Sequence, residues 1–171
     1  MLKKPSRLFI VIFAFVISGC QAAQNKAFAI YLLAQDIPAT ELAQSDIDLL
    51  SLKNEPIISN NDIISYDKTN HTIELTQVAY SRIQQIFQTP VKVFGIPFVV
   101  CVGKERIYMG AFMTPVSSIS YDGIVIGQPF ETEPTIIQIT RGYPGADFST
   151  GKDPRGDPRI IKALEQDKKL K

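Results

Sequence analysis

Tryptophan is absent from this chain of 171 residues, histidine occurs once, at His71, and cysteine occurs only at Cys20 and Cys101. A zinc site needs three or four ligands, most often cysteine or histidine, so no metal site is expected. Basic and acidic residues nearly balance, at 18 and 17, and no basic patch of the kind that binds nucleic acid is present. No Gly-Lys pair is followed by Ser or Thr. A phosphate-binding loop is therefore missing, and no cofactor is expected.

The first twenty residues carry the most specific signal in the chain. Lys3, Lys4 and Arg7 form a positive segment, and residues 8–17 are apolar without interruption. Ten apolar residues suit the core of a signal peptide, whereas a transmembrane helix needs about twenty. The segment ISGC at residues 17–20 follows directly. It resembles a bacterial lipobox, in which an aliphatic and two small residues precede the cysteine that receives a diacylglyceryl thioether.

The lipobox resemblance implies a cleaved signal peptide at residues 1–19 and a lipidated Cys20 that opens a short tether, residues 20–26. The expected location is extracytoplasmic, with the membrane as partner through the N-terminal lipid. Gln21 in place of Asp would permit sorting to an outer membrane, and a single-membrane cell would hold the protein on its outer face. Two alternatives remain open: an ordinary secretory signal cut near Ala22-Ala23, and an uncleaved N-terminal anchor.

Residues 27–171 are predicted to form one domain. Removal of residues 1–19 leaves 152 of the 171 residues, enough for a hydrophobic core, with a net charge near −2. No Gly/Ser-rich or Pro-rich linker divides this part of the chain. Short runs with β-type patterns predict strands at residues 27–33, 63–66, 72–75, 98–102, 106–112, 117–120, 123–126 and 135–140.

Two helices are predicted among these strands. Thr76 is a good N-cap, and helical spacing of apolar residues continues from it to Phe87. Asp157 caps a second helix, with Pro158 in its first turn. The inward side of this second helix is predicted to hold Ile160, Ile161 and Leu164. The order of the elements predicts an α+β fold with a mainly antiparallel sheet, one mid-chain helix and a C-terminal helix.

Two apolar segments are candidates for the core. Cys101 lies within residues 98–102, which are apolar throughout, so we expect a central strand and a buried, unreactive thiol. On the following strand, Tyr108 and Phe112 share one face and Met109 and Met113 the other. These side chains form either two covered faces of a core strand or an adaptable apolar groove for a ligand.

Three segments of the domain resemble bacterial exported proteins and lipoproteins that have no assigned activity: residues 62–76, 95–100 and 123–126. Residues 73–126 are also similar to the head of the first periplasmic domain of the export protein SecD. In that family an acidic residue usually precedes the turn glycine, where this chain has Val102 before Gly103. The SecD resemblance implies a fold and does not imply transport.

His71 is the first candidate for chemistry, although a single histidine beside a turn is more often structural. Neither Ser117 nor its neighbours lie in a G-x-S-x-G or S-x-x-K motif. The tripeptide at residues 155–157, Arg-Gly-Asp, matches an integrin motif by chance, since Asp157 is needed as a helix cap.

The leading hypothesis is a lipid-anchored, extracytoplasmic, non-catalytic binding or accessory domain that works with an envelope or export protein. The alternative is an envelope enzyme whose site is assembled around His71 with Asp67 and Ser117.

Overall fold

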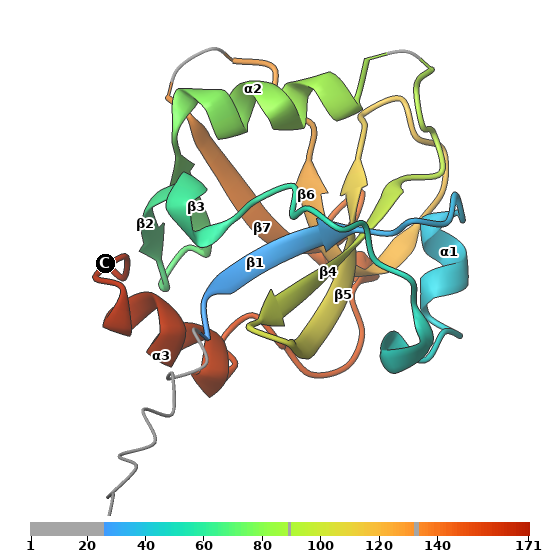
Figure 1. Ribbon diagram of the computed structural model, residues 1–171. Helices are drawn as coiled ribbons and strands as arrows, with labels where there is room; N and C mark the ends of the chain where they lie inside the picture. The colour runs from blue at the N-terminus through green and yellow to red at the C-terminus, as the bar shows by residue number, and fades with distance from the viewer. Residues whose placement is uncertain (1–25, 89, 132–133) are drawn as a thin grey trace, which may run out of the picture.

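The computed structural model describes residues 26–88, 90–131 and 134–171. The predicted signal peptide and Cys20 lie outside these residues. The described chain forms seven strands, three α-helices and three short 3-10 helices (Figure 1). The strands are β1 (Phe28–Leu32), β2 (Ile63–Asp67), β3 (Thr72–Leu75), β4 (Ile96–Val102), β5 (Glu105–Met113), β6 (Tyr121–Gly127) and β7 (Ile136–Tyr143). The helices are α1 (Ala39–Leu42), α2 (Gln77–Ile86) and α3 (Pro158–Gln166), with the 3-10 helices η1 (Ile47–Leu49), η2 (Asn60–Asp62) and η3 (Ala146–Phe148).

The strands form one sheet in the order β1-β4-β5-β6-β7-β3-β2. All neighbouring strands are antiparallel except β5 and β6, which are parallel. The two predicted hairpins, β2–β3 and β4–β5, are both present, and Gly103 turns the second with a φ of 61°. A side chain at that φ is strained, so glycine suits the turn. The α+β fold with a mainly antiparallel sheet is confirmed.

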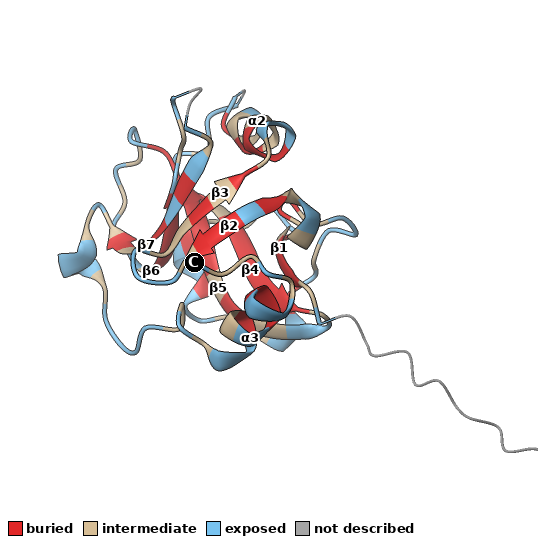
Figure 2. Ribbon diagram, turned by 90° about the vertical axis from the view of Figure 1, so that its left-hand side faces the viewer, coloured by how far each residue is buried: buried red, intermediate tan, exposed pale blue. Residues whose placement is uncertain are grey.

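The sheet bends around one large core. Phe28 from β1 and Tyr66 from β2, at opposite edges of the sheet, belong to the same cluster of buried side chains. This cluster also contains Ile83 from α2 and Leu164 from α3. The two helices lie at opposite ends of the bent sheet (Figure 1), and Figure 2 shows the buried residues concentrated on the strands between them. The helices therefore cover the openings that the bend leaves.

A smaller core lies on the outer face of β4 and β5. There α1 and the segment after it contribute Leu42 and Leu50, which pack with Val99, Cys101 and Met113. Tyr108 and Phe112 point instead into the large core. The expectation that β4 is covered on both faces is confirmed. On β5, Tyr108, Phe112 and Met113 are buried as expected for a core strand, whereas Met109 is only half-buried and lines a cavity.

Both edges of the sheet are closed by the chain itself. Along β1, the amide of Ile30 donates to Ile58 O at 2.8 Å, and the amide of Ile57 donates to Ile30 O at 2.8 Å. Along β2, the amide of Tyr66 donates to Lys169 O at 2.7 Å, and that of Lys171 donates to Tyr66 O at 2.8 Å. An open edge invites pairing with other chains, and these contacts remove that hazard.

Helices α2 and α3 begin at the capping residues predicted from the sequence. The Thr76 hydroxyl accepts a hydrogen bond from the amide of Ala79 at 3.3 Å, and Asp157 Oδ1 accepts one from the amide of Arg159 at 2.9 Å. In α3, Ile160 and Leu164 are buried as predicted, whereas Ile161 is only half-buried and Ala163 takes its inward place. None of the helices in the described part of the chain is long and apolar enough to cross a membrane.

The predicted strand at residues 117–120 is wrong. This segment belongs to the connection between β5 and β6, residues 114–120, which returns the chain to the start of a parallel neighbour. Such crossovers usually need about a dozen residues or more. The Ser117 hydroxyl donates to Val93 O at 2.6 Å, and the Tyr143 hydroxyl donates to Thr114 O at 3.0 Å. These bonds hold the connection in an irregular path beside Val93 and Tyr143.

Truncation of the Leu164 side chain, which is 0% exposed, should destabilise the domain. We expect Leu164→Ala to lower the free energy of unfolding by about 2–5 kcal/mol, because a buried cavity is added to the lost apolar burial. Urea denaturation of residues 27–171 measures the change. Lys162→Ala on the exposed side of α3 should change it by less than about 0.5 kcal/mol. Equal stability of the Leu164 variant and the parent domain would show that α3 is not part of the cooperative unit.

Candidate functional site

His71 lies in the turn between β2 and β3 with a φ of 53°. Its Nδ1 is 2.9 Å from the hydroxyl of Tyr66, and a hydrogen bond joins the two side chains. Tyr66 is 1% exposed, and burial is the main cause that raises its pKa to about 12. The single histidine therefore contacts a phenol that stays protonated at ordinary pH.

An ion pair from the C-terminal loop lies beside these two rings. Arg155 Nη2 donates to Asp153 Oδ2 at 2.6 Å, and Arg155 Nη1 donates to Ile139 O at 2.7 Å. The hydrogen bonds from Arg155 lower the pKa of Asp153 to about 2. Burial, followed by the positive charge of Arg155, lowers the pKa of His71. Arg155 therefore fastens the C-terminal loop to Ile139 of β7, and β7 is the sheet neighbour of β3.

The other residues of the predicted enzyme site have separate partners. Asp67 Oδ1 accepts from the amide of Thr69 at 2.7 Å and so closes its own turn. Ser117 lies on the β5–β6 connection, and its hydroxyl donates to Val93 O. Strands β6 and β7 separate β5 from β3, the strand that follows His71. The structure brings His71 together with Tyr66 and does not place Asp67 or Ser117 on the imidazole. Arg155 of the Arg-Gly-Asp tripeptide forms hydrogen bonds to Asp153 and Ile139 within the domain.

Cys101 is 3% exposed and lies in the smaller core on the outer face of β4. Burial raises the pKa of its thiol, and Arg106 opposes that change only in part. The guanidinium of Arg106 donates to Ile47 O on η1. The thiol is therefore kept protonated and covered, as the sequence predicted.

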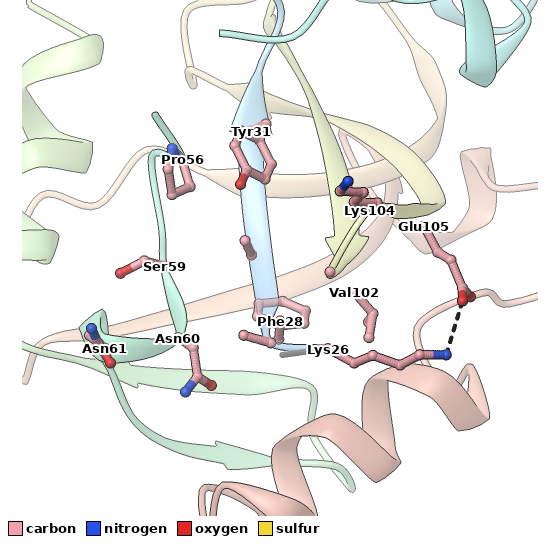
Figure 3. A pocket seen from close by; sticks show the side chains of 13 residues that line it. Lys26, Phe28, Tyr31, Pro56, Ser59, Asn60, Asn61, Val102, Lys104 and Glu105 are labelled. Carbon is pink, nitrogen blue, oxygen red and sulfur yellow. Dashed lines mark hydrogen bonds and ion pairs between the residues drawn. The ribbon is translucent and has the colours of Figure 1, made fainter. Parts of the chain in front are cut away.

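A groove of about 480 Å³ lies where the described chain begins (Figure 3). Three segments form it: residues 26–31 at and beyond the start of β1, residues 102–105 at the β4–β5 turn, and residues 56–61 before and within η2. Its polar side chains are those of Lys26, Tyr31, Ser59, Asn60, Asn61, Lys104 and Glu105. In Figure 3, Lys26 reaches toward Glu105 on one side of β1, while Asn60 and Asn61 lie on the other side.

The sequence does not predict this groove, because the segments that form it are distant along the chain. Residues 59–62 are a turn cluster by composition, and they do form a turn: Asp62 Oδ2 accepts from the amide and the hydroxyl of Ser59, both at 2.7 Å. Arg82 from α2 pairs with Asp62 at 3.2 Å and fixes that turn to the helix. The hydrogen bonds to Asp62, from Arg82 first, lower the pKa of its carboxyl against the effect of burial. Nothing in the local sequence indicates that this turn faces β1.

A second cavity, of about 350 Å³, lies between the outer face of β5 and β6 and the loop at residues 149–154. Its walls include Leu42, Met109 and Tyr121, and Arg141 donates to the carbonyls of Thr150 and Gly151 there. Within the described ranges, no group of three or more His, Cys, Asp or Glu side chains could hold a metal ion.

No protein-family model, no curated protein and no solved structure matches this chain. The resemblances drawn from the sequence therefore remain predictions.

Acid should weaken the contact of His71 with Tyr66. Because folding lowers the pKa of His71, the unfolded chain binds the proton more readily, and stability falls as pH drops below about 6.5. We expect the free energy of unfolding to decrease between about pH 7.5 and about pH 5.5, as measured by urea titration. His71→Asn tolerates the same φ and removes the titration. This variant should lose less stability over that range; an equal loss in both proteins would contradict the assignment.

Cys101 should react slowly with an aromatic disulfide reagent in the folded domain of residues 27–171, where it is the only cysteine. Only the exposed thiolate is a nucleophile, and denaturation in urea should raise the absorbance-monitored rate to that of a free peptide thiol. Ser118→Cys adds a thiol at an exposed position and provides the matched rapid control. Native labelling of Cys101 as fast as that of the introduced thiol would contradict the burial.

Proposed function

We propose that this protein is a membrane-anchored bacterial lipoprotein whose extracytoplasmic domain serves in binding rather than catalysis. The observation that carries the proposal is the lipobox-like segment at residues 17–20, behind a basic segment and ten apolar residues. Only the thiol of Cys20 can form the thioether. One acyl chain holds a protein only marginally, at about 0.8 kcal/mol per buried CH₂ group, whereas two or three chains anchor it stably.

The start of the folded domain is consistent with a short anchor. Lys26 follows Cys20 by six residues and is exposed at the beginning of the described chain. Six residues span at most roughly 20 Å when fully extended. A domain on this tether would stay close to the lipid surface, with the groove at β1 on the side from which the chain enters.

The surroundings of the candidate chemical groups support a binding role over the enzyme alternative. His71 is engaged with the buried Tyr66, Ser117 with Val93, and Asp67 with its own turn. The groove, in contrast, exposes amides, a phenol and both signs of charge without a nucleophile–base pair among its lining side chains. Such a surface suits recognition of a polar ligand or of an envelope protein.

Cys20→Ala should abolish lipid attachment. We expect metabolic labelling with an alkyne analogue of palmitate to mark the wild-type protein and to leave the variant unmarked, because no other residue supplies the thioether sulfur at that position. Cys101→Ala is the matched control, since it removes a buried thiol and should keep full labelling. Continued labelling of the Cys20 variant would refute the lipoprotein proposal.

A further inference from the structure

The groove at β1 lies at the end of the sheet nearest the predicted anchor, which we call the N-terminal pole. Phe28 pairs with Val102, and Leu32 pairs with Phe98, so the start of β1 and the β4–β5 turn share one end of the sheet. The side chain of Lys26 reaches that turn and lies 3.1 Å from Glu105. If Cys20 is lipidated, this pole is the part of the domain that the six-residue tether holds at the membrane.

The pole carries more positive than negative charge, although the mature chain is slightly acidic. Glu105 is shared by two cations, Lys26 at 3.1 Å and Arg159 at 3.6 Å, while Asp157 pairs with Arg159 at 2.8 Å. Lys104 lines the groove with no ion pair among the described residues. The two ion pairs of Glu105 are exposed on both partners, and such pairs are weak enough to exchange for another anion.

The groove also holds an unsatisfied acceptor. Asn60 Oδ1 is buried and has no hydrogen-bond partner among the described residues. A buried acceptor without a partner is unfavourable, so a ligand that donates a hydrogen bond to it is stabilised. Asn61 is exposed beside it, and its amide is a donor suited to a phosphate oxygen. Tyr31 lines the far end of the groove, and burial is the main cause that raises the pKa of its phenol. Lysines on one side of β1 and the amides of Asn60 and Asn61 on the other match a ligand with a phosphate and a hydroxyl or ammonium group.

We propose that this groove binds the phosphate-bearing headgroup of a membrane phospholipid and thereby holds the anchored domain with its N-terminal pole against the bilayer. The proposal rests on the lipid anchor proposed above and adds an orientation to it. The lysines meet the phosphate, and the Asn60 oxygen accepts a hydrogen bond from the headgroup's hydroxyl or ammonium. The acyl chains of the bound lipid stay in the bilayer, so no apolar cavity is needed.

Lysine footprinting tests the proposal on the full lipidated protein. The protein is placed in vesicles of phosphatidylethanolamine and phosphatidylglycerol and treated with a membrane-impermeant acetylating ester, and each lysine is quantified by mass spectrometry. Each lysine near an anionic surface is worth about 1 kcal/mol, so we expect labelling of Lys26 and Lys104 to fall about fivefold relative to micelles of dodecyl maltoside. Lys68 and Lys152, exposed on the β2–β3 turn and the C-terminal loop, should label equally in both.

Two controls separate headgroup binding from nearness to a membrane. In vesicles of a monoglucosyl diacylglycerol, which lack phosphate, the protection of Lys26 and Lys104 should disappear; protection that persists there would overturn the phosphate assignment in favour of a sugar or of simple proximity. Asn61→Asp places a negative charge in the groove and should reduce the protection in phospholipid vesicles. Asn54→Asp makes the same change at an exposed position outside the groove lining and should not.

The same samples distinguish failure of this proposal from failure of the anchor. Flotation of the wild-type protein with the vesicles reports the anchor alone. A protein that floats while Lys104 stays fully labelled would overturn headgroup binding and leave the lipoprotein proposal intact. A protein that does not float would overturn both.

Discussion

The bend of the sheet around a single core is the constraint on which the rest of the structure depends. Because β1 and β2 lie at opposite edges and bury Phe28 and Tyr66 in the same cluster, the sheet cannot be flat, and its curvature leaves openings at both ends. The helices α2 and α3 fill those openings with apolar faces. The same curvature leaves two edges with unpaired backbone groups, which must be satisfied when they are withdrawn from water. The chain satisfies them with residues 57–58 along β1 and 169–171 along β2.

Local signals in the sequence predict the elements well and their arrangement less well. The cap at Thr76, the cap at Asp157 and the turn at Gly103 each depend on one side chain acting on its own neighbourhood, and all three are present. The place of β6 between β5 and β7 has no such signal, because it results from an unusually short crossover held by hydrogen bonds to distant residues. The groove could not be predicted for the same reason: it exists only where three separate segments meet.

His71 has a structural role, although a single histidine suggests catalysis. Both its backbone and its ring form hydrogen bonds within the domain. Its carbonyl accepts a hydrogen bond from the amide of Ile139 at 2.9 Å, and its ring contacts Tyr66. The backbone of Tyr66 also forms hydrogen bonds with the backbones of Lys169 and Lys171. The turn at His71 and residues 169–171 therefore meet at a single buried tyrosine, Tyr66.

The closure of β2 by the last residues also bears on the order in which the domain can assemble. A chain that is synthesised from its N-terminus exposes β1 first, but β1 must wait for β4 before it has a strand partner. The outer edge of β2 stays bare until residues 169–171 arrive, after every other strand is present. Contacts between residues so far apart in sequence slow folding, because the intervening chain must be ordered first. A chain without residues 169–171 would expose an edge of β2, and an unpaired strand edge favours association with other chains.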